Sequence, residues 1–183
     1  MEQAEGVATV GGGGPGGREG GRIRTARLEL VPLAVGDADE MVAVLGDERL
    51  YEFTGGRPPT LDGLRARYAR LAAGRSADGT QEWRNWVVRL RDGRAVGTVQ
   101  ATITDAGRAA EVAWVVGTAW QGRGLASEAA RGLVAWLEAR GVLTVTAHVH
   151  PDHHASAAVA ARAGLSPTGA EHDGEREWRT RAR

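Results

Sequence analysis

The nine residues from His148 to Ser156, HVHPDHHAS, contain four histidines and one aspartate. Imidazole and carboxylate side chains bind zinc and similar metals, and a bound metal activates water for hydrolysis. A metal-dependent hydrolase is therefore one interpretation of this segment. Its ligands would be His148, His150, Asp152 and His153.

The same segment has a purely structural interpretation. His148 and His150 alternate as residues of a strand do, and Asp152 stands where an aspartate commonly caps a following helix. A hydrolase with H-x-H-x-D-H, the metal signature of the metallo-β-lactamase fold, needs further histidine and aspartate ligands downstream. Only one histidine, His172, follows His154. We therefore favour the structural interpretation and expect no metal ion.

A second stretch with chemical potential is QGRGLAS, residues 121–127, where an apolar segment passes through two glycines into a helical pattern. Gly122 and Gly124 allow the backbone to approach a ligand closely. The unpaired amides and the dipole at a helix start favour an anion, and Arg123 adds a positive charge. The stretch lacks the Lys-Ser/Thr of a P-loop and the full G-x-G-x-x-G of a dinucleotide site. A phosphate group is the expected ligand.

Hydrophobic periodicity predicts the elements that must position these two stretches. Alternating apolar residues indicate strands, and apolar residues three or four positions apart indicate helices. Asp92-Gly93 and Asp173-Gly174 predict hairpin turns. Thr60 predicts a helix N-cap and Gly141 a helix C-cap. The expected strands are 23–33, 82–90, 94–104, 109–117, 142–150 and two within 164–181, and the expected helices are 36–47, 60–74, 122–141 and 152–164.

The resulting order, β-α-α-β-β-β-α-β-α-β-β, predicts an α/β fold. Helices should cover both faces of a mixed, mostly antiparallel sheet of six to seven strands. Residues 1–21 are rich in glycine and low in complexity, so we expect a disordered tail there. Residues 22–183 suffice for one hydrophobic core, and we expect a single domain.

Composition narrows the class of function. The 23 basic and 23 acidic groups balance, so nothing in the charge requires a nucleic-acid partner. The absence of cysteine excludes disulfides and thiol nucleophiles on the protein. The chain does not begin with a basic and then apolar leader, and its apolar runs are too short for a membrane span. We therefore expect a cytoplasmic protein without membrane contact.

The turn QGRGLA, Gln121 to Ala126, fits the Q/R-x-x-G-x-G/A signature of the GNAT acyltransferases, which bind acyl-coenzyme A. Its flanks, EVAWVVGTAWQGRGLASEAARGLVAWL and TVTAHVHPDHHASAAVAARAGL, resemble the subgroup that contains the ribosomal-protein alanine N-acetyltransferases. The similarity follows the element order of residues 23–179 and is concentrated in residues 111–164. It implies the GNAT fold, with acetyl-coenzyme A (acetyl-CoA) as co-substrate and no metal.

The resemblance also implies which residues bind the coenzyme. In relatives the strand AEVAWVV diverges from its neighbour, so its backbone would pair with the pantetheine arm and polarise the thioester carbonyl. The amides of the QGRGLAS turn would bind the pyrophosphate. His153 stands where relatives usually carry asparagine, and an imidazole can replace one of its hydrogen bonds. The implied coenzyme residues are Val115, Val116, Gln121, Gly122, Arg123, Gly124, Leu125, Ala126, Ser127 and His153.

Two further residues match catalytic positions of relatives. Glu111 stands where many relatives carry a glutamate that removes the amine proton, usually through water. Ser156 matches a serine that lies near the coenzyme sulfur and protonates the departing thiolate. Each has a simpler interpretation as well, because a glutamate at a strand start and a serine in the first turn of a helix often only face solvent.

The acceptor cleft of relatives is built by the region between the first two helices and by the last hairpin, here residues 51–60 and 169–177. Glu52 and Glu171 could attract a cationic amine there, although charged turns are more often only solvated. Trp83 and Trp114 could line the cleft or fill the core.

The predicted function is an N-acetyltransferase that moves an acetyl group from acetyl-CoA to a primary amine, on a small molecule or on a protein or peptide N-terminus. The amine would attack directly in a ternary complex, which agrees with the missing cysteine. The alternatives are a longer acyl-CoA as donor, a noncatalytic acyl-CoA-binding module and, remotely, the metal-dependent hydrolase. The sequence leaves a homodimer open.

Overall fold

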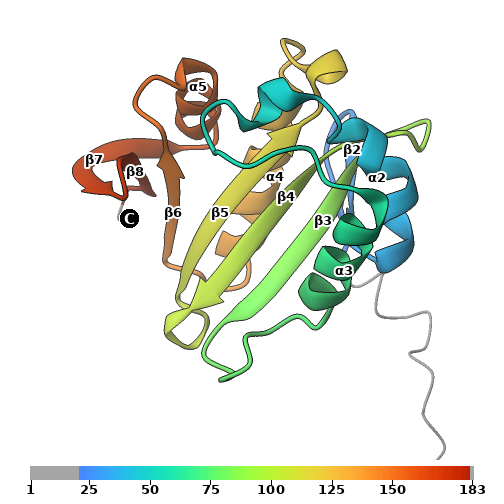
Figure 1. Cartoon of the computed structure of the whole chain (residues 1–183). Coiled ribbons are helices and arrows are strands. Elements are labelled where there is room, and N and C mark those ends of the chain that lie inside the picture. The colour runs from blue at the N-terminus through green and yellow to red at the C-terminus, as the bar shows by residue number, and fades with distance from the viewer. Residues whose placement is uncertain (1–20, 182–183) are drawn as a thin grey trace, which may run out of the picture.

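The computed structural model describes residues 21–181, and its centre is one sheet of eight strands in the order β1-β2-β3-β4-β5-β6-β8-β7 (Figure 1). Neighbouring strands run antiparallel except for β5 and β6, which are parallel. This confirms the mixed, mostly antiparallel sheet. The strands are β1 (Ile23–Arg24), β2 (Leu28–Pro32), β3 (Glu82–Leu90), β4 (Ala95–Thr104), β5 (Ala109–Val116), β6 (Thr144–Val149), β7 (Leu165–His172) and β8 (Glu175–Thr180).

The first strand differs from the prediction of one strand over 23–33. The chain reverses at Thr25, whose amide donates to the Leu28 carbonyl at 3.0 Å while its hydroxyl accepts from the Leu28 amide at 3.1 Å. β1 and β2 therefore pair with each other, and the sheet has eight strands rather than six to seven. Residues 25–27 contain none of the glycine, proline, asparagine or aspartate that usually indicates a turn, so the sequence pattern did not reveal the break between the two strands.

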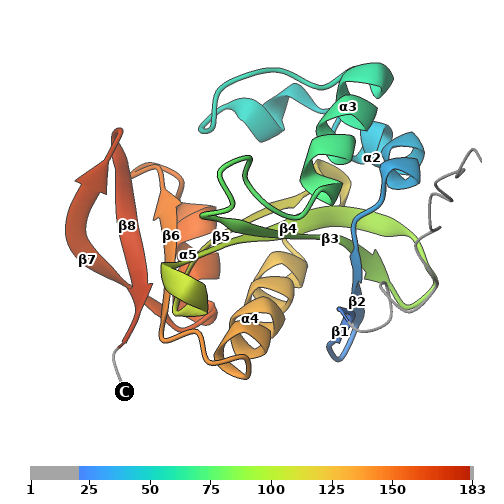
Figure 2. The same ribbon diagram turned by 90° about the horizontal axis from the view of Figure 1, so that it is seen from below.

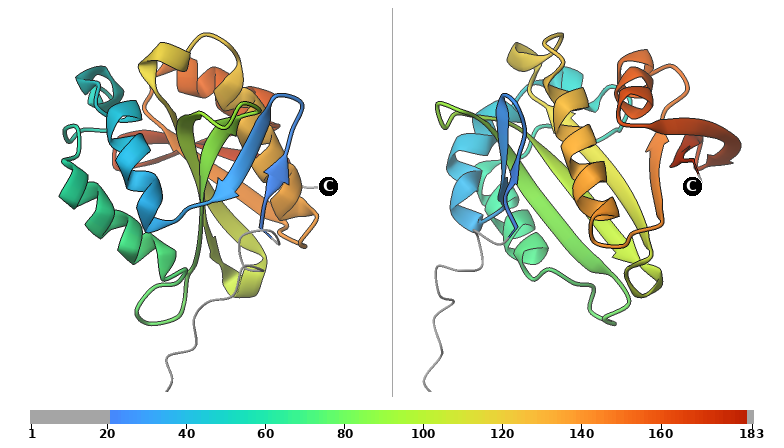
Figure 3. Two further views of the ribbon diagram at one scale, coloured as in Figure 1. Left: turned by 90° about the vertical axis from the view of Figure 1, so that its right-hand side faces the viewer. Right: turned by 180° about the vertical axis from the view of Figure 1, so that it is seen from behind.

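Helices cover both faces of the sheet, as predicted (Figures 2 and 3). α2 (Ala38–Val44) and α3 (Leu61–Ala72) pack on one face, where Met41, Leu64 and Val87 are fully buried. α4 (Leu125–Glu138) and α5 (His154–Arg162) share the core of the other face, in which the apolar stripe of α4 is buried. Short 3-10 turns at Val35–Asp37, Glu48–Tyr51, Asp105–Gly107 and Thr118–Trp120 complete the connections.

Local signals in the sequence had mixed outcomes. The Thr60 hydroxyl caps α3 by accepting from the Gly63 amide at 3.2 Å, and Asp173 and Gly174 adopt the positive φ that a hairpin turn of this kind needs. The predicted Asp152 cap is wrong. α5 begins one residue later, after His153, and no side chain caps it.

The most consequential feature of the sheet is the divergence of β5 and β6. These strands pair only over Ala109–Glu111 and Thr144–Thr146, after which they separate (Figure 1). On its other edge β5 stays paired with β4 as far as Val116. The upper half of β5 thus has one free edge, and the start of α5 lies beside the opening.

No helix in the part of the chain that the structure describes is long and apolar enough to cross a membrane. The predicted glycine-rich tail, residues 1–21, lies outside the described residues apart from Gly21. The expected tail and the single domain therefore stay predictions.

Candidate active site

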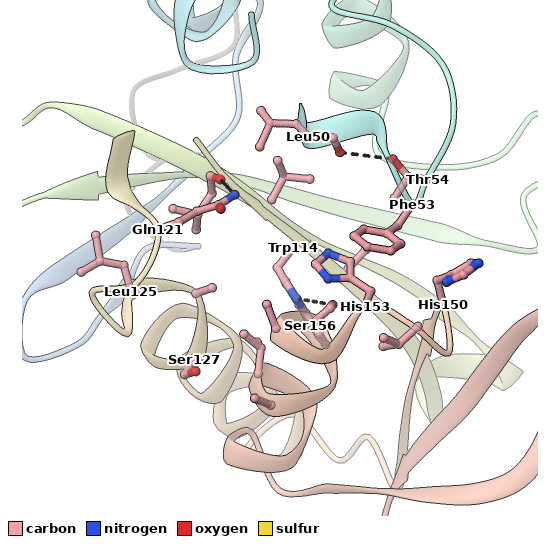
Figure 4. Close-up of a pocket in the computed structure, with 18 of the residues that line it drawn as sticks. Leu50, Phe53, Thr54, Trp114, Gln121, Leu125, Ser127, His150, His153 and Ser156 are labelled. Atoms are coloured by element: carbon pink, nitrogen blue, oxygen red, sulfur yellow. Dashed lines mark hydrogen bonds between the residues drawn. The ribbon is translucent and has the colours of Figure 1, made fainter. Parts of the chain in front are cut away.

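A pocket of about 430 Å³ occupies the opening between β5 and β6 (Figure 4). Its walls are the upper half of β5, the turn before α4, the end of β6 with the start of α5, and the segment between α2 and α3. A volume of this order suits a small-molecule ligand. Among the residues that line it are Phe53, Trp114, Val116, Gln121, Gly124, His148, His153 and Ser156.

Two glycines shape the turn before α4. Gly122 and Gly124 have φ values of +73° and +74°, in the left-handed region that side chains disfavour. Gly124 immediately precedes the helix, and no side chain caps it. Among residues 21–181 we find no hydrogen-bond acceptor for the backbone amides of residues 122–127. These amides and the positive end of the α4 dipole are free to bind an anion.

The free edge of β5 begins beside this turn. The side-chain amide of Gln121 donates to the Val116 carbonyl at 3.1 Å, which ties the turn to the strand. Val115 also lines the pocket, but its carbonyl oxygen lies against Gly97 of β4. Because successive residues of a strand direct their backbone groups to opposite edges, Trp114 and Val116 face the opening.

Arg27 lies beside this turn, and the sequence analysis did not identify it as a candidate site residue. Its guanidinium donates to the Arg123 carbonyl at 3.0 Å and lies 3.6 Å from the position that a Cβ on Gly124 would take. Nε of Arg27 also pairs with the Glu128 carboxylate at 2.7 Å. Almost a hundred residues separate Arg27 from the turn in the sequence, so no local pattern could reveal that this cation lies beside it.

Glu128, in the first turn of α4, joins the N-terminal hairpin to the helix. Its side chain is only 11% exposed and accepts hydrogen bonds from the Thr25 hydroxyl at 2.6 Å and the Arg27 amide at 2.7 Å. Burial alone would raise the pKa of this carboxyl, but the hydrogen bonds and the Arg27 charge outweigh burial and lower its pKa. The ionised form is therefore the stabilising one.

Replacement of this carboxylate gives a pH-dependent prediction. Glu128→Gln should lower the free energy of unfolding by about 2 kcal/mol at pH 7, because charge-assisted hydrogen bonds are lost. Folding lowers the pKa of Glu128, so its ionised carboxylate contributes fully to stability at pH values above the pKa of the carboxyl in the unfolded chain. This contribution disappears as the pH falls through the folded-state pKa. Urea unfolding at pH 7 and pH 3 measures the difference. The control Glu48→Gln, at an exposed glutamate, should differ little from wild type at either pH.

Trp120 and two arginines flank the same turn. The guanidinium carbons of Arg94 and Arg123 lie 5.0 and 5.1 Å from the centroid of the Trp120 ring, within cation–π range. Arg94 is also paired with Asp92 at 2.6 Å. Because Arg27 and Arg94 are paired with Glu128 and Asp92, Arg123 supplies the positive charge beside the turn that matches an anionic ligand.

Ser156 lies in the pocket on the first turn of α5, where the sequence analysis placed it (Figure 4). The Trp114 indole donates to its Oγ at 3.1 Å. An indole N–H can only donate, so the serine accepts there and its own proton is directed elsewhere. The sequence analysis had suggested that Trp114 lines the cleft for the acceptor substrate. The structure shows instead that this β5 residue contacts a candidate catalytic hydroxyl.

His153 packs against the segment between α2 and α3. Its ring stacks on Phe53 with centroids 4.5 Å apart and planes 19° apart, and His150 lies 5.4 Å from the same phenyl ring. Burial and the nearby His150 lower the pKa of His153, and Glu52 opposes them weakly. A neutral His153 presents one donor and one acceptor to the pocket.

Glu111 and His148 face each other across the junction where β5 and β6 separate. The Nδ1 atom of His148 lies 3.4 Å from Oε1 of Glu111. The glutamate side chain is 59% exposed and is absent from the pocket wall, whereas the histidine is 19% exposed and lines it. Of the two, only His148 contacts the cavity, although the sequence analysis singled out Glu111.

The remaining predicted acceptor residues lie apart from the cavity wall. Trp83 pairs across the strands with Thr102, which in turn pairs with Glu111, so Trp83 lies on the face of the sheet that α2 and α3 cover. Its indole N–H donates to the side chain of Gln81. Glu52 is exposed next to Phe53, and Glu171 is exposed near the end of β7. None of these three lines the pocket.

The histidines of HVHPDHHAS do not converge. His148 turns toward Glu111 and His172, whereas His150 and His153 turn toward Phe53. Among the described residues, no group of three or more histidine, aspartate and glutamate side chains is arranged to hold a metal ion. The geometry gives the hydrolase interpretation no support.

Comparison with known proteins shows the family of this chain. The family model of the GNAT acetyltransferase domain matches residues 27–166, which include the glycine turn, the free edge of β5 and Ser156. The chain belongs to the GNAT acetyltransferase family. As a member it is an acyltransferase, and the resemblance noted from the sequence is confirmed.

Solved structures agree with the GNAT fold. A GNAT acetyltransferase from Bacillus anthracis matches with a TM-score of 0.70 at 17% identity, over 86% of this chain and 95% of its own. RimL, a ribosomal L7/L12 α-N-protein acetyltransferase with bound coenzyme A, matches with a TM-score of 0.74 at 18% identity, over 88% of this chain and 97% of its own. AAC(6')-Ib with ribostamycin and coenzyme A matches with a TM-score of 0.70 at 17% identity, over 84% of this chain and 92% of its own. No curated protein matches the chain.

Proposed function

We propose that this GNAT protein transfers an acetyl group from acetyl-CoA directly to a primary amine. The observation that carries the proposal is the pocket at the free edge of β5, with the glycine turn at one end and Ser156 beside the strand. A diphosphate at the turn and an extended pantetheine arm along β5 would fit this arrangement.

The geometry of the pocket supports a proposal for the coenzyme residues. The amides of residues 122–127 would bind the pyrophosphate, with Arg27 and Arg123 supplying positive charge. The edge groups of Trp114 and Val116 would pair with the pantetheine arm, and an edge amide would stabilise the oxyanion of the attacked thioester. His153 would contribute one hydrogen bond from the opposite wall.

The acceptor would approach from the face of the sheet that carries Glu111, because Trp114 and Ser156 occupy the other face of β5. Glu175 lines the pocket, and its charge would favour a cationic amine, to which the exposed Glu52 and Glu171 would add. Two of the structural neighbours are a protein N-terminal acetyltransferase and a protein solved with an aminoglycoside. Both kinds of acceptor carry an ammonium group, so both belong in the first trial.

The test is calorimetric titration with acetyl-CoA and coenzyme A, followed by thiol release with an amine panel. The panel contains ribostamycin, spermidine and a short peptide with a free N-terminus. We expect micromolar binding of acetyl-CoA and acyl transfer to at least one amine. Butyryl-CoA in the same assay tests a longer acyl group. Absence of coenzyme binding to the folded protein would overturn the proposal.

Ser156→Ala separates an enzyme from a module that only binds acyl-CoA. The variant should lower kcat about a hundredfold, because the departing thiolate loses its proton donor, while acetyl-CoA affinity stays close to wild type. Ser166→Ala, on β7 outside the pocket, is the matched control and should keep the wild-type rate. An unchanged kcat in Ser156→Ala would remove this serine from the mechanism.

A further inference from the structure

The contact between His148 and Glu111 bears on the proton that the acceptor amine must lose. At neutral pH a primary amine is mostly protonated, so transfer needs a base that can reach it. The structure offers a carboxylate outside the pocket wall and an imidazole within it, with Nδ1 of the imidazole 3.4 Å from the carboxylate. A histidine with a carboxylate this close to its Nδ1 atom resembles the base and orienting group of a hydrolytic triad.

We infer that His148 accepts the amine proton and that Glu111 is a positioning residue that orients the imidazole. This inference rests on the proposed acetyl transfer. A carboxylate beside Nδ1 favours the tautomer with its proton on that atom, which leaves Nε2 as the basic atom. Glu111 also stabilises the imidazolium that forms when the proton arrives.

The surroundings of His148 suit a group that gains and releases a proton. Its ring centroid lies 5.8 Å from that of His172, which is largely exposed and leads toward solvent. Its cross-strand partner on β8 is Glu177, whose carboxylate is already engaged by Thr168 and Arg179. Among the described residues, the titratable groups around His148 are Glu111 from β5, His172 from β7, and Glu177 and the pocket residue Glu175 from β8. His150 lies directly after β6, beside Phe53.

The transfer then balances in protons and electrons. The ammonium gives one proton to His148, and the neutral nitrogen attacks the thioester carbonyl carbon, forming the C–N bond. The C–S bond breaks with its electron pair on sulfur. Ser156 protonates the thiolate and regains a proton from the nitrogen as the amide forms. The products are the acetamide, coenzyme A as free thiol, and one proton that leaves His148 for solvent.

The test compares His148→Gln, Glu111→Gln and the control His154→Gln, whose residue is exposed on α5 outside the pocket. The acceptor is the amine that the panel above selects, and kcat/KM is measured from pH 5 to pH 9. In wild type, kcat/KM should rise with pH along an ascending limb, because the base must be unprotonated to accept the proton of the amine. His148→Gln should lose this limb and fall about a hundredfold or more at pH 7. Glu111→Gln should keep a limb but react about tenfold more slowly.

Each outcome has a separate meaning. Partial recovery of a His148→Ala variant by added imidazole supports a base at this position, and His154→Gln should match wild type throughout. If His148→Gln keeps the wild-type rate and pH profile, or if Glu111→Gln alone abolishes the limb, the inference is overturned while the proposed acetyl transfer stands. If no amine in the panel is acetylated, the proposed function fails and this inference fails with it.

Discussion

Gly124→Val should weaken acetyl-CoA binding about a hundredfold, while the protein remains folded. Gly124 has a φ of +74° and precedes the first amide of α4, so a branched side chain there strains the turn and redirects the amides beside it. A new Cβ would also stand 3.6 Å from the Arg27 guanidinium and occupy space in front of that cation. Loss of two hydrogen bonds to a charged diphosphate accounts for an effect of this size.

The matched control for this variant is Gly141→Val, at the other end of α4. Gly141 has a φ of +88°, and no atom lies within 4 Å of the Cβ position. Both substitutions should cost about 1–2 kcal/mol of folding free energy, because both place an L side chain in the left-handed region. Calorimetric titration should then show weak binding for Gly124→Val and wild-type binding for Gly141→Val. Equal losses in both would indicate a stability effect and contradict a role of the turn in binding.

Gly97→Ala should be the most destabilising small substitution in the sheet, lowering the free energy of unfolding by about 3 kcal/mol. A Cβ on Gly97 would stand 2.1 Å from the Val115 carbonyl oxygen and 3.0 Å from the Val116 Cα. Both neighbours are backbone atoms of β5, so the strand itself must move. Because the free edge of β5 lines the pocket, coenzyme binding should weaken together with stability.

Urea unfolding and acetyl-CoA titration of the same samples measure both effects. Gly36→Ala provides the control, because nothing lies within 4 Å of its Cβ position and its φ is not positive. This control should stay within about 0.5 kcal/mol of wild type. A Gly97→Ala protein as stable as wild type, with unchanged binding, would show that the β4–β5 contact adapts and does not fix the position of the free edge.

The sequence by itself was sufficient for those parts of the protein that depend on local pattern. The apolar stripe of α4, the hairpin at Asp173-Gly174 and the Thr60 cap each follow from residues within one or two turns of chain. The glycine turn could be recognised for the same reason, since both its left-handed residues and the helix start belong to one short motif. The order of elements followed from these signals except for the division of the first strand into β1 and β2, and the resemblance of QGRGLA and its flanks indicated the GNAT family.

Only the tertiary structure decided which groups share a site. Arg27 meets the glycine turn, Trp114 meets Ser156, and His148 meets Glu111, and each pair comes from different elements of the fold. The divergence of β5 and β6 brings these pairs around one pocket. No periodicity encodes it, because strand separation depends on how close β4, β5 and the helices approach one another. The sequence therefore determined the elements and the family, and packing between distant elements determined the arrangement of the candidate chemical groups.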